Sequence, residues 1–318
     1  MNLRDATRQY ALRSNFLASL SFFGNFAVYF LALFLGIRYF ETWSVSVLAV
    51  LLLALAAVRL YVLQHDTGHL TLFRTRRQNE WAGYALSTFT FTPFRAMQYN
   101  HNLHHAYIGN LDARDKGEIN TMTLREWQAA SPGQRLFYRL YRNPVLLIGV
   151  GSVWTYFFRY RWPKNTLKVG VAGVLIHDAF VIGYITFLYW QFGWPGVVVL
   201  LGGTALGGML GVFLVYLQHN FEDTYWDRKP DLDFRRACLQ GASCVNFGWL
   251  FDEAVANITK HDIHHYAAAI PSYRLRQAHR ELEGEFGFRN IGLREALRSF
   301  RLKLWDEDAG RLVPFPRD

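Results

Sequence analysis

Residues 43–69 read WSVSVLAVLLLALAAVRLYVLQHDTGH. This stretch joins an apolar segment, residues 43–63, to a polar end that carries His65 and His69. A membrane-spanning helix needs about 20 apolar residues, and histidines four positions apart lie on one helix face. The stretch therefore predicts a membrane span that presents two imidazoles at one surface of the bilayer.

Three further segments have the length and apolarity of membrane spans. They cover residues 16–35, 167–189 and 196–217. Two stretches that are only partly apolar, residues 81–97 and 247–258, predict helices that lie at the membrane interface. Together these segments predict a four-helix membrane protein with accessory helices at the bilayer surface.

Arginine and lysine are concentrated in the connections that flank the apolar segments, and the net charge of the 318-residue chain is +9. The positive-inside rule places such connections, and with them both termini, in the cytosol. The polar region 275–318 is expected to cap the cytosolic face. We therefore expect one all-α integral membrane domain over residues 1–318.

The basic charge also fits a nucleic-acid-binding face or a docking face for an acidic partner. The flanking of apolar segments by arginine favours the membrane interpretation, and no nucleic-acid-binding motif is present, so we expect no nucleic-acid partner. Only two cysteines occur, Cys238 and Cys244. They are too few and too isolated for a disulfide framework or an iron–sulfur cluster.

Eight of the eleven histidines fall in three clusters, and a ninth, His219, follows the fourth apolar segment. The clusters are HDTGH at 65–69, HNLHH at 101–105 and HDIHH at 261–265. Residues i, i+3 and i+4 share one side of a helix, so each cluster is expected to present two or three imidazoles to one point. The clusters and His219 are all predicted to lie on the cytosolic side, where the nine imidazoles can converge.

Nine imidazoles are more than one tetrahedral zinc ion can use, and two six-coordinate metal ions with open positions fit the number better. The two remaining histidines are expected to behave differently. His279 lies in a polar run and is expected to be exposed and dispensable, whereas His177 lies within the third predicted span.

The three clusters, in this order and with this topology, resemble the membrane fatty acyl desaturase family. The similarity extends over roughly residues 50–275 and is greatest to bacterial delta-12, or omega-6, acyl desaturases. It is carried by HDTGH at 65–69, HNLHHAYIGNLD at 101–112, YRNP at 141–144, QHNFEDTYW at 218–226 and IPSYRL at 270–275.

The resemblance implies that the nine histidines bind two iron ions. These expected ligands are His65, His69, His101, His104, His105, His219, His261, His264 and His265. It further implies an enzyme of the bacterial inner membrane that uses dioxygen to oxidise an unactivated fatty acyl chain, most simply to a cis double bond. Electrons would come from an external donor, such as a ferredoxin or cytochrome b5, that docks on the basic cytosolic face.

Several alternatives remain open from the sequence. The same di-iron chemistry can yield a hydroxyl group, an acetylenic bond or a terminal alkene by decarboxylation. A zinc membrane hydrolase is suggested by the similarity of HDTGH to HExxH, and a non-enzymatic metal or haem carrier is a third class. The acyl carrier is equally open between a lipid, coenzyme A, acyl carrier protein and a free fatty acid.

Six further residues are candidates for supporting roles. Asp66, Asp262, Glu222 and Asp223 are candidates for carboxylates that offset the metal charge or hydrogen-bond to the ligand imidazoles. His177 and Asp178 lie at a depth where ionisable groups are costly. Because neighbouring residues do not share a helix face, we expect them to have separate partners, and they are expected either to lock helix packing or to line the end of an acyl tunnel.

Overall fold

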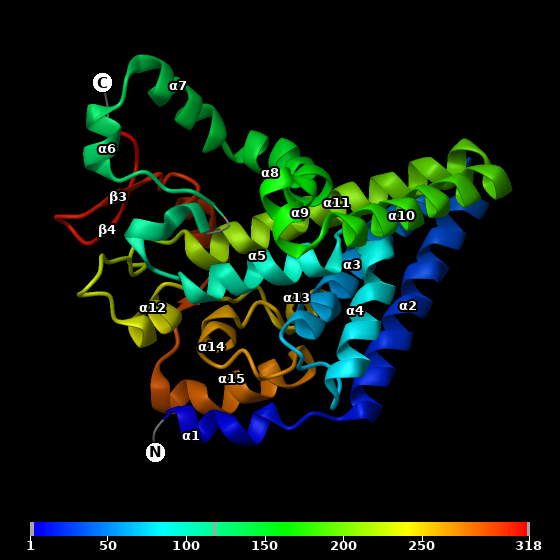
Figure 1. Ribbon diagram of the computed structural model, residues 1–318, viewed down its shortest axis with the longest axis horizontal. Helices are drawn as coiled ribbons and strands as arrows, with labels where there is room; N and C mark the ends of the chain where they lie inside the picture. The colour runs from blue at the N-terminus through cyan, green and yellow to red at the C-terminus, as the bar shows by residue number, and fades with distance from the viewer. Residues whose placement is uncertain (1–2, 117–118, 317–318) are drawn as a thin grey trace.

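The computed structural model describes residues 3–116 and 119–316, and that part of the chain is mostly helical (Figure 1). Within it, four helices are long and apolar enough to cross a membrane, which agrees with the four predicted spans. They are α2 (Asn15–Arg38), α3 (Trp43–Gly68), α10 (Val171–Phe192) and α11 (Trp194–His219).

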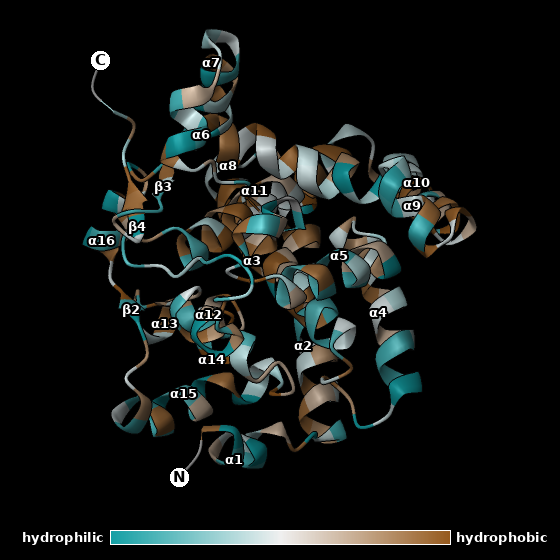
Figure 2. Ribbon diagram, turned by 60° about the vertical axis from the view of Figure 1, so that its left-hand side comes forward, coloured by the Kyte–Doolittle hydropathy of each residue, from teal (hydrophilic) through white to brown (hydrophobic). Residues whose placement is uncertain are grey.

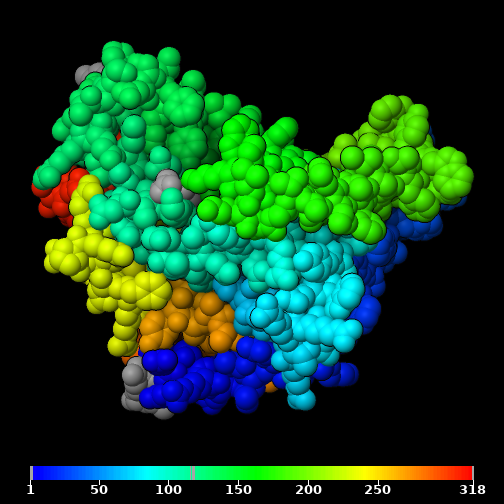
Figure 3. Space-filling view, in the orientation of Figure 1, coloured from blue at the N-terminus to red at the C-terminus, as the bar shows by residue number. Residues whose placement is uncertain are grey.

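The third span differs from the predicted one at both ends. It begins at Val171 rather than at residue 167, because Gly170 adopts a left-handed backbone (φ +97°) that ends the short helix α9 (Pro163–Val169). At the other end a single residue, Gly193 (φ +63°), separates α10 from α11, where the sequence suggests a turn of several residues. The two helices form a hairpin, and the end at which they meet projects from the rest of the molecule (Figure 3).

Helix α3 lies at the centre of the membrane part and packs against α2, α4 and α11. Its contact with α11 is close because α11 presents glycines there. A Cβ atom added at Gly207 would lie 2.9 Å from the backbone oxygen of Ala54, and one at Gly203 would lie 2.6 Å from the Leu53 side chain. Small residues let the two backbones approach, as is common between membrane helices.

The region predicted as one interfacial helix, residues 81–97, is two helices. Helix α4 (Arg76–Thr90) starts at a capping box between Thr75 and Gln78 and ends where Phe91 adopts a left-handed conformation (φ 58°). After Pro93 the chain turns into α5 (Phe94–Ala106). The buried Gln64 side chain of α3 bridges this turn, since its amide donates to Thr92 O (2.9 Å) and its carbonyl accepts from Thr90 Oγ1 (2.6 Å).

A run of short helices connects α5 to the third span. Two of these helices begin at a side-chain cap followed by proline: Ser131 caps the N-terminus of α7, and Asn143 caps that of α8. The run comprises η2 (Leu111–Lys116), α6 (Leu124–Ala129), α7 (Pro132–Tyr141), α8 (Pro144–Val153), the π-helix η3 (Trp154–Phe158) and η4 (Arg159–Arg161).

The remaining helices and strands form a layer on the side where α3 and α11 end, in which α1 lies beside α15 and β3 lies beside α6 (Figures 1 and 2). The strands form two small pairs, β1 with β2 in parallel and β3 with β4 antiparallel. The second predicted interfacial helix, residues 247–258, is reduced to the short helix α13. The elements of this layer are α1 (Leu3–Arg8), η1 (Gln9–Ala11), α12 (Phe234–Gln240), β1 (Cys244–Val245), α13 (Trp249–Ala254), α14 (His261–Tyr266), α15 (Ser272–Phe286), β2 (Asn290–Ile291), α16 (Leu293–Ser299), β3 (Leu304–Asp306) and β4 (Arg311–Val313).

The close contact of α3 with α11 can be tested by Gly207→Ala. The added methyl group should push the helices apart and lower the free energy of unfolding by about 1–3 kcal/mol, the usual cost of overpacking. Thermal unfolding of the purified protein in detergent measures this. Gly183→Ala on α10 is the matched control, because a Cβ there meets nothing within 4 Å. Equal stability of the two variants would contradict the packing argument.

Candidate metal centre

The nine histidines predicted from the sequence come together at the C-terminal ends of α3 and α11. His65 lies in the last turn of α3, and His69 keeps a helical conformation as its C-terminal residue (φ −81°, ψ −3°), so the two rings stay close. Helix α5 supplies three more histidines and α14 another three, while His219 is the last residue of α11. All nine rings are buried or half-buried.

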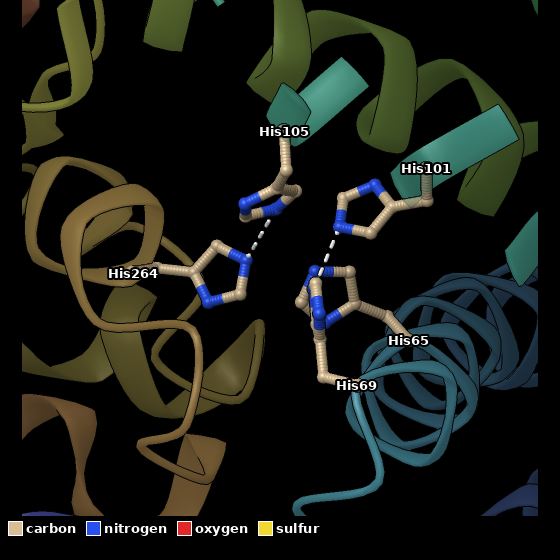
Figure 4. Close-up of side chains that lie close together, drawn as sticks. All are labelled: His65, His69, His101, His105 and His264. Carbon is tan, nitrogen blue, oxygen red and sulfur yellow. Dashed lines mark hydrogen bonds between the residues drawn. The ribbon is translucent and has the colours of Figure 1, made fainter. Parts of the chain in front are cut away.

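The rings form two groups rather than one group for each cluster. In each group the candidate donor atoms lie within 4.8 Å of one another. Figure 4 shows the first group, in which the rings from α3, α5 and α14 point toward a shared space. The first group is His65, His69, His101, His105 and His264, and the second is His104, His219, His261 and His265.

This division corrects the expectation that each cluster points at one site. In α5, His101 and His105 belong to the first group and His104 to the second. Around the helix axis, position i+4 is rotated by only about 40° from position i. Position i+3 is rotated in the opposite direction and lies about 100° from i+4. The i+3 histidine of both HxxHH clusters therefore crosses to the other group.

The spacing of the ring nitrogens suits one metal ion in each group. His69 and His101 approach to 2.9 Å between their Nε2 atoms, and His105 and His264 to 3.1 Å. In the second group, the Nε2 atoms of His261 lie 3.0 Å from those of His265 and 3.1 Å from those of His219. Two nitrogens bound at right angles to one ion at about 2.1 Å lie about 3.0 Å apart.

The protonation state of the rings also suits metal binding. Burial is the largest cause that holds the pKa of each ring on α5 and α14 well below the ordinary histidine value, and neighbouring histidines add to it. These imidazoles are therefore neutral, and a neutral imidazole has the lone pair that a metal ion needs.

Hydrogen bonds fix the orientation of two rings. The Nδ1 atom of His219 donates to the Gly241 carbonyl (3.0 Å), and Nδ1 of His65 donates to Asp66 (3.2 Å). Each bond leaves Nε2 unprotonated, and Nε2 of His65 is buried without a protein partner. A buried ring nitrogen that has a lone pair and no hydrogen-bond donor beside it is suited to bind a metal ion.

Of the four candidate supporting carboxylates, the two aspartates within the clusters are buried beside the histidines. Asp66 accepts from His65 through one oxygen and from the Ser272 backbone N–H (2.7 Å) through the other, so it ties α3 to the start of α15. Asp262 accepts from the Ile263 N–H (2.7 Å), and burial raises its pKa to about 7.

The structure argues against a similar role for Glu222 and Asp223. Both carboxylates are exposed. Glu222 pairs with Arg311 (3.2 Å) and Asp223 with Arg289 (3.0 Å). These ion pairs hold the chain after α11 to the C-terminal strands and the segment before β2, which is a structural role.

The expectation of separate partners for His177 and Asp178 is wrong. Both bind the guanidinium of Arg161, which donates to Asp178 Oδ1 (2.7 Å) and to His177 Nε2 (3.1 Å). The planar guanidinium has five donors and reaches two neighbouring residues at once. The pair also lies only six or seven residues from the start of α10, nearer the helix end than the sequence suggests.

The expectation that His279 is exposed is also wrong. Its side chain is 3% exposed, with Nε2 3.9 Å from Asp262 Oδ2 and the ring against Phe288. Burial lowers its pKa to about 4, so the ring is neutral. The polar run around it conceals this, because α15 is amphipathic and His279 shares the buried face with Leu275 and Leu282.

A cavity of about 320 Å³ opens onto both histidine groups. Its walls come from α3, α5, α8, η3 and α11, and it touches two histidines of each group: His65, His101, His104 and His261. Apolar and aromatic side chains make up most of its lining, whereas Arg114, Asn120 and Arg159 add polar groups. Neither His177 nor Asp178 lines it. This size and composition are typical of a site for an apolar ligand.

Sequence reasoning missed one residue that supports the centre. Arg142, the arginine of the YRNP run at 141–144, is fully buried. It donates to Asn220 Oδ1 (2.5 Å), next to His219, and to Thr121 Oγ1 (2.8 Å). Its guanidinium also lies over the ring of Tyr216. The YRNP run, which carries part of the family resemblance, pointed to Arg142. Only the fold shows that Arg142 connects the end of α11 to the loop at the cavity.

The fold and the histidine geometry define a membrane protein with a candidate metal centre, and sequence comparison gives its class. The fatty acid desaturase family matches residues 41–296. The chain therefore belongs to the fatty acid desaturase family, whose members are oxidoreductases. The resemblance noted from the histidine clusters is thus confirmed.

Similar proteins come from several bacteria. The chain is 31% identical over 306 residues to a fatty acid desaturase of Bacillus subtilis, with 93% of this chain and 84% of the relative covered. It is 25% identical to an sn-1 acyl-lipid omega-3 desaturase (ferredoxin) of Synechocystis, with 69% and 62% covered. An sn-1 oleoyl-lipid 12-desaturase of the same organism is 24% identical, with 71% and 65% covered. The chain thus spans less than two thirds of the two Synechocystis proteins.

The division of the histidines predicts different effects for neighbouring residues. His104→Ala should deplete the second metal position and His105→Ala the first, because their rings belong to different groups. Metal content after purification, together with a spectroscopic probe that separates the two positions, measures this. The same lost position in both variants would contradict the grouping.

The two kinds of carboxylate also predict different results. Asp66→Ala removes the acceptor that orients His65 and should lower metal affinity about 10- to 100-fold. Glu222→Ala is the control, since its carboxylate is exposed and pairs with Arg311. Metal retention during dialysis against a chelator compares them. If Asp66→Ala retains metal as well as Glu222→Ala does, the supporting role of Asp66 is wrong.

Proposed function

We propose that the nine histidines bind two iron ions and that the protein inserts a cis double bond into a fatty acyl chain with dioxygen as oxidant. The observation that carries the proposal is the cavity, which is largely apolar and opens onto both histidine groups. An acyl chain lying in it passes beside both metal positions, whereas a hydrophilic substrate would be poorly matched to its walls.

An all-histidine donor set suits iron with positions left open. Six-coordinate ions held by the five rings of one group and the four rings of the other would keep one and two positions open. Bound iron supplies the strong oxidant that unactivated methylene groups require. The protein's own residues hold the chain, fix its position relative to the two groups and exclude water from the cavity.

A zinc hydrolase is less well supported. Such an enzyme would need Asp66 as a general base, but both of its oxygens already accept hydrogen bonds, from His65 and from the Ser272 backbone. It would also leave most of the nine histidines without a role.

We infer that the acyl chain is attached to a membrane lipid and that the donor is a ferredoxin-like protein. Two similar proteins are named acyl-lipid and oleoyl-lipid desaturases, and one of these names includes ferredoxin. The net charge of +9 suits an acidic donor. In a bacterial inner membrane, the positive-inside rule would place the histidine face and both termini in the cytoplasm.

The proposal is tested by expression in a host that lacks acyl desaturases, followed by mass spectrometry of lipid-linked and free acyl chains. We expect a new cis double bond in lipid-linked chains, and none with His264→Ala. A hydroxylated, acetylenic or decarboxylated product would agree with the proposed di-iron centre but would show that the reaction is not the insertion of a cis double bond. A wild-type protein that carries zinc in place of iron would overturn the proposal.

The docking of the donor predicts a salt dependence. The rate with a ferredoxin should fall as ionic strength rises, because screening shortens the Debye length from about 10 Å at 0.1 M to about 3 Å at 1 M. Turnover driven by a chemical reductant, which needs no docking, is the control and should change little. Turnover with NADPH alone, or a rate with ferredoxin that does not depend on salt, would refute the external acidic donor.

A further inference from the structure

Three tyrosines that contact one another through Tyr61 line the cavity. The rings of Tyr61 and Tyr156 meet edge to face with centroids 5.4 Å apart, and the hydroxyls of Tyr61 and Tyr160 lie 3.2 Å apart. Beyond them lies a second space of about 30 Å³, also bordered by Tyr61 and Tyr156 and lined further by Phe89 and Thr204. Tyr61 and Tyr156 therefore lie between the main cavity and this second, smaller space.

Helix α11 leaves space for the ring of Tyr156. A Cβ atom added at Gly211 would lie 2.5 Å from the Tyr156 hydroxyl, and one at Gly208 would lie 3.1 Å from its ring. Any larger residue at these positions would displace the ring. Two glycines therefore set the position of the Tyr156 ring. Of these, Gly211 lies about 12 Å from His219 along the axis of α11.

A second contact holds the backbone of Tyr156. Arg161 donates to the Tyr156 carbonyl (2.9 Å) and the Phe157 carbonyl (3.3 Å), both of which lie in the π-helix η3. The same guanidinium binds Asp178 and His177 of α10. A π-helical turn is a rare conformation that is frequent at functional sites. The ionisable pair of α10 therefore acts on the cavity through Arg161, without lining it.

The cavity borders two different spaces. Arg114 and Asn120 line both the cavity and a surface groove beside α6. Tyr61, Tyr156 and Gly211 line both the cavity and the second, smaller space. An acyl chain with a polar head would place the head beside Arg114 and its methyl end against Tyr156, because burying a polar head among apolar groups is unfavourable.

We propose, on the basis of the proposed function, that Tyr156 is the stop for the methyl end of the acyl chain. The position of the double bond is then counted from the methyl end, and the length of chain beyond the metal centre is limited by this ring. Arg161 and Asp178 are positioning residues that keep Tyr156 in place.

The test uses the full-length protein in membranes and a series of lipid-linked acyl chains that differ by two carbons. Wild-type protein should place the double bond at a constant distance from the methyl end. Tyr156→Ala joins the two spaces, so chains with a longer methyl-side segment should improve about tenfold or more relative to wild type. Gly211→Ala should shift the preference in the opposite direction, because it crowds the ring.

Asp178→Asn tests the positioning role. It removes the charge that pairs with Arg161 but keeps an acceptor, so we expect a broader range of double-bond positions with unchanged iron content. Phe158→Ala is the matched control, since Phe158 is an exposed aromatic residue of the same π-helix and lines no described cavity. Its product pattern should equal that of wild type.

The outcomes separate the two proposals. If the wild-type protein oxidises no acyl chain, the proposed function fails and this inference fails with it. If wild type is active and counts from the carboxyl end, or if both Tyr156→Ala and Gly211→Ala are active with an unchanged pattern, only the methyl-end stop is wrong. Should Tyr156→Ala not fold, Gly211→Ala and Asp178→Asn decide the question.

Discussion

The close packing of α3 against α11 is the constraint on which the rest of the structure depends. Each helix ends in a histidine of a different group, and the backbones meet where Gly207 faces Ala54. This contact fixes the relative height of His65 and His219, so it also fixes the separation of the two histidine groups. The α5 and α14 histidines can complete both groups only because these two ends are held together.

Buried and half-buried polar groups also hold the helices in fixed positions relative to one another. Asp66 links α3 to α15, Arg142 links the end of α11 to the cavity loop, and Arg161 links η3 to α10. Asp66 and Arg142 are buried and Arg161 is half-buried, and each has several hydrogen-bond partners. Leaving such a group unpaired costs several kcal/mol, so these contacts define one arrangement of the helices.

The same arrangement relates the candidate chemistry to its substrate. The cavity touches both histidine groups, and its lining is mostly apolar and aromatic with a few polar residues. A flexible acyl chain has no polar group along its length to mark a carbon. Its position must therefore be set at its ends, and a rigid aromatic stop held by glycines and a guanidinium gives a physical means of doing so.

The sequence by itself determined the four spans, the nine histidines and the family, because apolar length and helical spacing are local properties. Asp66, proposed from the sequence as a partner of a ligand imidazole, accepts a hydrogen bond from His65, whereas the role proposed for Asp262 stays a prediction. The division of each HxxHH cluster between two groups, the burial of Arg142 and His279, and the shared partner of His177 and Asp178 were decided by the tertiary structure. Each of these depends on which side chains from distant segments meet, and a linear pattern of charge and hydropathy does not contain that information.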